Sequence, residues 1–167
     1  LLVCGSISLR SENEVVTNCT VGLFCEAQFK QAIIHFVSRK AMNIYGLDSK
    51  VIELLVDEKL IKTSADLYSL TQQQLANLDR MGDKSAINLL ESLGKSKHTT
   101  LARFIFSLGI HDVGETTAKT LADNFHSLES IENTSLDELL NIRDIGPVVA
   151  NKNLSFFKQK HNHEERV

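Results

Sequence analysis

Met81-Gly82-Asp83-Lys84-Ser85-Ala86 decides the fold, because Val113-Gly114-Glu115-Thr116-Thr117-Ala118 and Ile145-Gly146-Pro147-Val148-Val149-Ala150 repeat its pattern. Each stretch reads apolar-Gly-x-x-x-Ala without gaps. The glycines are 32 residues apart both times, from 82 to 114 and from 114 to 146. A constant period of this length is typical of a repeated supersecondary unit.

The repeated residues suit a turn that leads into a helix. The apolar residue anchors the turn in the core, and we expect glycine to adopt strained backbone angles and to let an anion approach closely. The first N–H groups of the following helix have no partner within the helix, and with the helix dipole they attract anions. Pro147 suits a first helical turn, and a small alanine one turn later allows close packing. The same pattern also occurs where a turn merely joins two closely packed helices, so that interpretation stays open.

A weaker copy, Tyr45-Gly46-Leu47-Asp48-Ser49-Lys50, lies 36 residues before Gly82 and lacks the alanine. Between the copies, apolar residues recur at the three- and four-residue steps of amphipathic helices. Helix starts are indicated at Ser64 and by the capping-box patterns that begin at Thr71 and Ser135. The sequence therefore predicts a mainly α fold with four tandem helix-hairpin-helix motifs.

The composition limits how such a chain could bind nucleic acid. Its formal net charge is −3, which does not favour nucleic-acid binding, so binding would have to use backbone N–H groups more than side-chain charge. Hydrophobic residues make up 43% of the chain, which supports a packed core. There is no apolar run of 18 residues and no signal-peptide pattern, so we expect no membrane partner. We also expect a monomer, although the sequence does not determine the oligomeric state.

Residues 1–28 differ from the rest, because all three cysteines, Cys4, Cys19 and Cys25, fall there in a β-prone stretch. An odd number argues against a disulfide framework, which leaves a metal site, a reactive thiol or buried apolar cysteines. We predict a small zinc-knuckle or β-hairpin segment over 1–28, a helix-hairpin-helix domain over 29–162 and a polar tail over 163–167. The chain starts without methionine inside what looks like a motif, so we expect a fragment of a larger protein.

Up to about Asn162, the chain resembles the helix-hairpin-helix domain of bacterial NAD-dependent DNA ligase. The resemblance runs in order through residues 36–42, 46–47, 78–90, 95–97, 99–104, 108–110, 113–118 and 144–150. It implies a DNA-binding segment that grips duplex DNA at a nick, so that the full enzyme can seal it in replication and repair. The partners implied are nicked duplex DNA and the other domains of the same ligase chain, in the bacterial cytoplasm.

In that family a four-cysteine zinc finger precedes the hairpins. Cys19 and Cys25 match its second cysteine pair and Cys4 matches half of the first, whereas the remaining position is Leu1. Structural zinc sites are almost always four-coordinate, so zinc here would need a water, a foreign donor or a residue beyond the chain. His35 is the nearest histidine, but we expect it in a helix beside Phe36. Zinc is therefore a candidate cofactor whose presence stays open.

The resemblance does not extend to catalysis. The Lys-x-Asp-Gly motif that carries the adenylated lysine of these ligases is absent, so we expect no active site in this chain. NAD and magnesium would serve the full-length enzyme and would not bind here. Two alternatives stay open: a helix-hairpin-helix module of a repair nuclease or junction-binding protein, and a helical protein-interaction domain.

The predicted DNA-binding residues fall into three groups. The hairpin glycines would allow close approach, residues just after them would donate backbone N–H groups, and nearby basic side chains would neutralise phosphate charge. The groups are, in that order, Gly46, Gly82, Gly114 and Gly146; Lys84, Thr116 and Val148; and Arg80, Lys119 and Lys152. Glu115 would repel phosphate, so we expect weaker binding at its hairpin.

Overall fold

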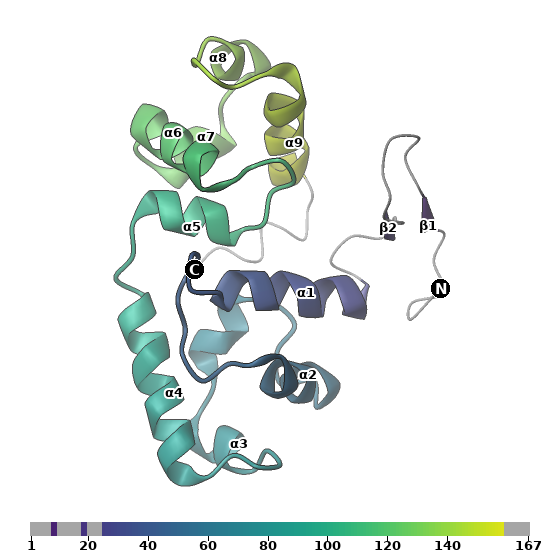
Figure 1. Cartoon of the computed structure of the whole chain (residues 1–167), viewed down its shortest axis with the longest axis vertical. Coiled ribbons are helices and arrows are strands. Elements are labelled where there is room, and N and C mark those ends of the chain that lie inside the picture. The colour runs from purple at the N-terminus through teal and green to yellow at the C-terminus, as the bar shows by residue number, and fades with distance from the viewer. Residues whose placement is uncertain (1–7, 10–17, 20–24, 159–167) are drawn as a thin grey trace.

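A computed structural model describes residues 8–9, 18–19 and 25–158. Within these residues the fold is mainly helical, as the sequence predicts (Figure 1). The helices are α1 (Glu26–Val37), α2 (Ser49–Asp57), the 3-10 helix η2 (Ala65–Ser69), α3 (Gln72–Ala76), α4 (Asp83–Ser96), α5 (Leu101–Ser107), α6 (Glu115–Phe125), α7 (Leu128–Glu132), α8 (Leu136–Leu140) and α9 (Pro147–Lys158). Two short strands, β1 (Ser8–Leu9) and β2 (Asn18–Cys19), pair antiparallel. Cys4 and most of the predicted knuckle lie outside the described residues.

The helices pack as consecutive pairs. Contacts join α1 to α2, α3 to α4, α5 to α6 and α8 to α9, so each repeat of the sequence pattern lies between two helices that touch. In Figure 1, α4 starts at the lower end of the long axis and rises, whereas α9 starts at the upper end and descends. The hairpins are therefore spread along the molecule. No helix among the described residues is both long and apolar enough to cross a bilayer.

Two hydrophobic clusters hold the described helices together. The first takes residues from α1 to α4, with Ile33, Ile52 and Leu89 almost wholly buried. The second takes residues from α5 to α9, with Ile105 and Leu121 wholly buried. Burial of apolar surface stabilises each cluster by roughly 25 cal/mol per Å². The chain thus folds as two small helical units in sequence.

Local signals start the helices where the sequence indicates. Thr71 and Ser135 both form capping boxes with the Gln or Glu three residues later, as predicted. Helix α9 begins at Pro147, which also agrees with the prediction. Within the described part of the chain, the interior contains one buried side-chain amide, that of Asn153 in α9. Its side chain is fully buried, and neither of its polar atoms has a hydrogen-bond partner among the described residues.

A polar joint connects the two units between α1 and α5, which are in contact (Figure 1). His35 Nε2 lies 2.7 Å from the carbonyl oxygen of Phe106, and the two rings are 4.8 Å apart. Arg103 Nε donates to the carbonyl of Ala41 at 3.0 Å, and its Nη2 donates to the carbonyl of Arg39 at 2.6 Å. The guanidinium therefore holds the loop that follows α1.

Candidate nucleic-acid interface

The three predicted repeats share one backbone geometry. The residue before each glycine is buried and donates its N–H to the carbonyl three residues earlier: Met81 to Leu78 at 3.2 Å, Val113 to Ile110 at 3.0 Å and Ile145 to Ile142 at 3.2 Å. The glycine carbonyl then accepts from the alanine four residues later, at 3.0 Å from Ala86, 2.9 Å from Ala118 and 3.0 Å from Ala150. All three alanines are 0% exposed, so the predicted close packing one turn into the helix is confirmed.

Strained backbone angles occur at a different position from the one predicted. Gly82 and Gly114 have φ values of −84° and −85°, which any residue adopts, and Gly146 has no positive φ. The left-handed residue lies two positions before each glycine: Arg80, Asp112 and Asp144 have φ values of 66°, 65° and 70°. Our expectation of strain was therefore wrong at Gly82, Gly114 and Gly146, because the chain reverses direction before it reaches them.

The hairpin glycines are instead open to the outside. A Cβ added to Gly82, Gly114 or Gly146 would meet no described atom within 4 Å. Neither the backbone angle nor internal packing therefore requires glycine at these positions. What glycine does provide is unobstructed access to the first turn of the following helix, where a side chain would otherwise stand.

The first-turn N–H groups after these glycines are free of protein acceptors within the described part of the chain. Five other helices differ, since a side chain of Asp48, Thr71, Thr100, Ser127 or Ser135 accepts an N–H of the first turn of α2, α3, α5, α7 or α8. Helix α1, which follows Cys25, also has no side-chain cap, but no hairpin glycine precedes it. The glycines that precede α4, α6 and α9 have no side chain, so they offer no such acceptor. The unpaired N–H groups belong to Asp83, Lys84, Ser85, Glu115, Thr116, Thr117, Val148 and Val149.

Comparison with known protein families agrees with this geometry. The family model described as "SAM-like Helix-hairpin-helix tandem" matches residues 38–95, and the one described as "Helix-hairpin-helix motif" matches residues 103–165. The chain carries helix-hairpin-helix motifs. The first match lies within the first helical unit and the second covers the other unit. Both units therefore contain matched helix-hairpin-helix sequence. Helix-hairpin-helix motifs indicate a DNA-binding module.

The hairpin between α1 and α2 departs from the helix-hairpin-helix geometry of the others. Helix α2 begins after Asp48, whose carboxylate accepts the N–H of Val51 at 2.9 Å. Gly46 has a φ of +94° and lies two residues before this cap, so its structural equivalent is Arg80 and not Gly82. Aligning Gly46 with Gly82 was therefore wrong. The first-turn amide that the other hairpins leave open is already bonded to a carboxylate here.

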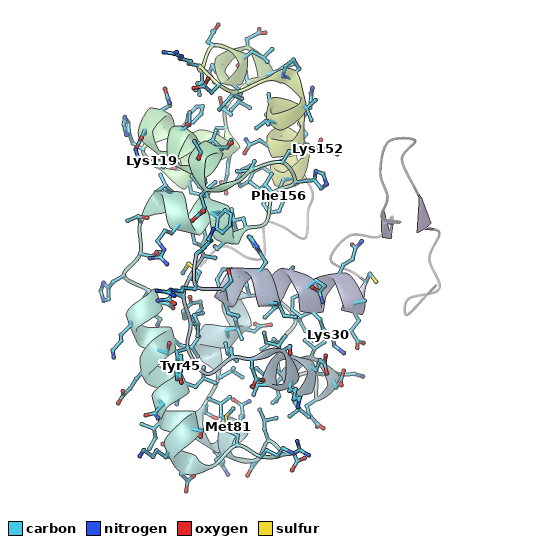
Figure 2. The ribbon with its side chains drawn as sticks, in the orientation of Figure 1. Lys30, Tyr45, Met81, Lys119, Lys152 and Phe156 are labelled. Atoms are coloured by element: carbon cyan, nitrogen blue, oxygen red, sulfur yellow. The ribbon has the colours of Figure 1, made fainter. Side chains whose placement is uncertain are left out.

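The predicted basic residues do not form one patch around the helix-hairpin-helix turns. In Figure 2, Lys119 on α6 and Lys152 on α9 project from opposite sides of the upper unit, and Met81 lies towards the lower end of the molecule. Lys119 forms an ion pair with Asp123 at 3.0 Å. Lys84 and Lys152 are exposed, as is Val148 at 62%. Neutralisation of an anion by these side chains would thus be local to each hairpin.

Glu115, the first residue of α6, has a partner from the other unit. Lys40 Nζ lies 3.1 Å from Glu115 Oε2, with both side chains largely exposed. The expected repulsion between Glu115 and phosphate is thereby reduced by a cation from the loop after α1. Sequence inspection missed this pair because 75 positions separate its members.

The metal prediction concerns residues that are mostly outside the described part of the chain. Cys25 is buried at 4% exposure and precedes α1, whereas nothing is described of Cys4 or of the side chain of Cys19. His35 is occupied with the Phe106 carbonyl. Among the described residues, no group of three His, Cys, Asp or Glu side chains could hold a metal ion.

Proposed function

We propose that this chain binds duplex DNA through the unpaired backbone amides at the starts of α4, α6 and α9. One contrast carries the proposal: these helices follow glycines with open surroundings, whereas five other helices have a side-chain cap. A glycine at the start of a helix costs a few tenths of a kcal/mol relative to a Ser, Thr, Asp or Asn cap. An anion that accepts these N–H groups would replace the missing caps.

Phosphate is the anion that best fits this arrangement. A hydrogen bond from an amide to a charged acceptor contributes roughly 1.5–3 kcal/mol, so several hairpins bind without an overall basic surface. The net charge of −3 is therefore compatible with DNA binding. Because α4 and α9 start at opposite ends of the long axis (Figure 1), they would reach phosphates at separate points of a duplex. We include the α1–α2 pair as a fourth, divergent hairpin.

The decisive experiment gives the open helix starts a cap. In the double variant Gly82→Ser and Gly146→Ser, each hydroxyl can accept a first-turn N–H, as Ser127 and Ser135 do. We expect thermal stability to hold or rise by a few tenths of a kcal/mol. Duplex affinity should fall about tenfold or more, because the hydroxymethyl groups occupy the amides and the approach path.

Two controls separate this effect from a general change in the helices. Gly94→Ala alters another glycine of α4 with open surroundings, and we expect higher stability with unchanged DNA affinity. Ser127→Gly removes the cap of α7 and should leave DNA affinity unchanged. If the double serine variant binds duplex as tightly as the unmodified chain, the amides are not the contact and the proposal fails.

A salt titration distinguishes DNA binding from the alternative of a helical protein-interaction domain. A chain that neutralises phosphates with Lys or Arg loses affinity with salt, with a log–log slope near −0.9 per neutralised phosphate. We expect a slope of about −2 to −3 from the exposed side chains of Arg80, Lys84 and Lys152 near the hairpins, whereas the neutral amides add affinity without adding to the slope. Absence of duplex binding at low salt would favour the interaction domain.

We further propose that the chain is the DNA-gripping segment of a bacterial NAD-dependent DNA ligase. The support is the resemblance in order along the chain, and the partners would be nicked duplex DNA and the other domains of the same ligase. It would act as a cytoplasmic monomer in replication and repair, with NAD and magnesium used by the full enzyme. Tighter binding to a nicked duplex than to a four-way junction supports this proposal. The reverse preference favours a repair nuclease or junction-binding protein.

We also propose zinc as a ligand of the N-terminal segment, held by Cys4, Cys19 and Cys25 with a fourth donor. The support is the cysteine spacing alone. Metal analysis of the purified chain tests it, with the expectation that bound zinc is lost in Cys19→Ser. A metal-free chain with an unchanged fold would refute it.

A further inference from the structure

Tyr45 stands out from the rest of the described surface. Its side chain is 82% exposed, more than any other large hydrophobic residue in the described part of the chain. Its backbone is nevertheless fixed, because its N–H donates to Ser92 Oγ of α4 at 2.7 Å. The preceding residue, Ile44, is buried and donates its N–H to the Val37 carbonyl at 3.0 Å. The ring thus projects from a rigid point of the first hairpin, in front of α4 (Figure 2).

Two surface hollows meet at Tyr45. One, of about 520 Å³, is bounded by α4 and the link to α5, and the other, of about 500 Å³, by the loop that leads into α2. Asn43 and Tyr45 line both. Lys95 and Arg103 line the first, and Arg39 lines the second. The exposed ring therefore lies between two hollows that each have at least one basic residue in their lining.

Each hollow also has one acidic residue in its lining, which a phosphate would have to avoid. Glu91 lines the larger hollow and Asp48 lines the smaller one. Asp48 is engaged by the Val51 N–H, as described above. The Arg103 guanidinium, which lines the larger hollow, donates to the carbonyls of Ala41 and Arg39, and Arg39 lines the smaller hollow.

We propose that Tyr45 is a stacking platform for an unpaired base of the bound DNA, with the flanking phosphates in the two hollows. Aromatic rings between basic groups are the chemistry by which proteins hold unpaired nucleotides. In an intact duplex both faces of each base are covered by neighbouring bases, so the ring requires a break in stacking. This inference rests on the proposed DNA binding, and it gives the first hairpin, whose amide Asp48 occupies, a separate means of contact.

Fluorescence and affinity measurements with matched DNA probes test the inference. The probes are an intact duplex and the same duplex with a single-nucleotide gap opposite 2-aminopurine. We expect the unmodified chain and Tyr45→Phe to quench 2-aminopurine and to bind the gapped probe more tightly. Tyr45→Ala should lose the quenching and about fivefold or more of its affinity for the gapped probe. Its affinity for the intact duplex and its salt slope should not change, because no charge is removed.

Leu140→Ala is the matched control, because Leu140 is an exposed apolar side chain of α8. It should behave as the unmodified chain with both probes, and thermal unfolding should show that Tyr45→Ala remains folded. If Tyr45→Ala binds and quenches like the unmodified chain, the stacking inference is overturned while DNA binding by the hairpins stands. If the unmodified chain binds neither probe at low salt, the proposed function itself fails.

Discussion

The ammonium group of Lys40 lies 3.1 Å from a carboxylate oxygen of Glu115, the first residue of α6. A carboxylate complements the dipole at a helix start, but here it also faces the approach of a phosphate. Lys40 comes from the other helical unit and offsets that charge. Both side chains are more than half exposed, so salt screens the pair and its contribution to stability is small. The pair therefore acts mainly on the affinity of the third hairpin for anions.

We expect Lys40→Ala to lower duplex affinity about twofold to fivefold at low salt, and Glu115→Gln to raise it by a similar factor. In the Glu115→Gln background, loss of Lys40 should cost less, because no carboxylate remains to be offset. Titrations of the two single variants and the double variant at two salt concentrations measure this coupling. Lys62→Ala is the control, because Lys62 is an exposed lysine of the same helical unit as Lys40. Equal costs of Lys40→Ala in both backgrounds would contradict the coupling.

Gly46→Ala should destabilise the chain by about 1–2 kcal/mol, because a side chain at a φ of +94° clashes with its own backbone. The space around Gly46 is not limiting, since its added Cβ would make an ordinary contact of 3.6 Å with Leu89 Cβ. Urea unfolding followed by circular dichroism measures the loss. Gly94→Ala in α4 should change stability in the opposite direction, by up to about 1 kcal/mol. An unchanged midpoint for Gly46→Ala would show that the loop relaxes.

Asn153→Leu should raise the free energy of unfolding by about 1–3 kcal/mol, because it removes two buried polar atoms that have no partner in the described structure. Thermal unfolding should then shift upward by roughly 2–4 °C per kcal/mol. The matched control is Asn151→Leu, since Asn151 is exposed on the same helix and donates to the Pro147 carbonyl at 2.8 Å. A loss of stability in Asn153→Leu would mean that this amide has a partner beyond the described residues.

The capping interaction of Glu138 at the start of α8 should make the stability of the chain depend on pH in the acid range. Hydrogen bonds from the Ser135 backbone N–H and the Thr134 hydroxyl hold the pKa of the Glu138 carboxyl below its ordinary value of 4.5. Its stabilising contribution is present above pH 4.5 and is lost as the pH falls through the lowered pKa. An NMR titration should show Glu138 protonating below 4.5, and Glu138→Gln should remove this part of the acid dependence. A carboxyl that titrates at its ordinary value would disprove the capping interaction in solution.

Local features of this fold could be predicted from the sequence because each depends on a few adjacent residues. The capping boxes at Thr71 and Ser135 and the proline start of α9 are of this kind. Burial of Ala86, Ala118 and Ala150 follows from a fixed spacing within one helix turn. The same spacing located the three open helix starts of the candidate interface.

The features that could not be predicted depend on backbone conformation or on distant contacts. A left-handed backbone occurs at Arg80, Asp112 and Asp144; aspartate adopts it more readily than most residues, but arginine gives no such signal, so the three do not form a sequence pattern. Gly46 meets the same conformational need in the first hairpin, so aligning glycine with glycine shifted the register there. The pairing of Lys40 with Glu115 and the anchoring of Tyr45 by Ser92 require the tertiary structure.

The two hydrophobic clusters share no residue, and the described bonds at the α1–α5 joint come mostly from polar groups. Water can replace those bonds at modest cost. Each unit is therefore stabilised by its own hydrophobic cluster and can stay folded when the other unit unfolds locally. Apart from Phe104 of α5, which packs against the first cluster, rotation at the joint would expose little of either interior. Curved or bent partners are then accommodated by rotation at the joint, while each half keeps its internal geometry.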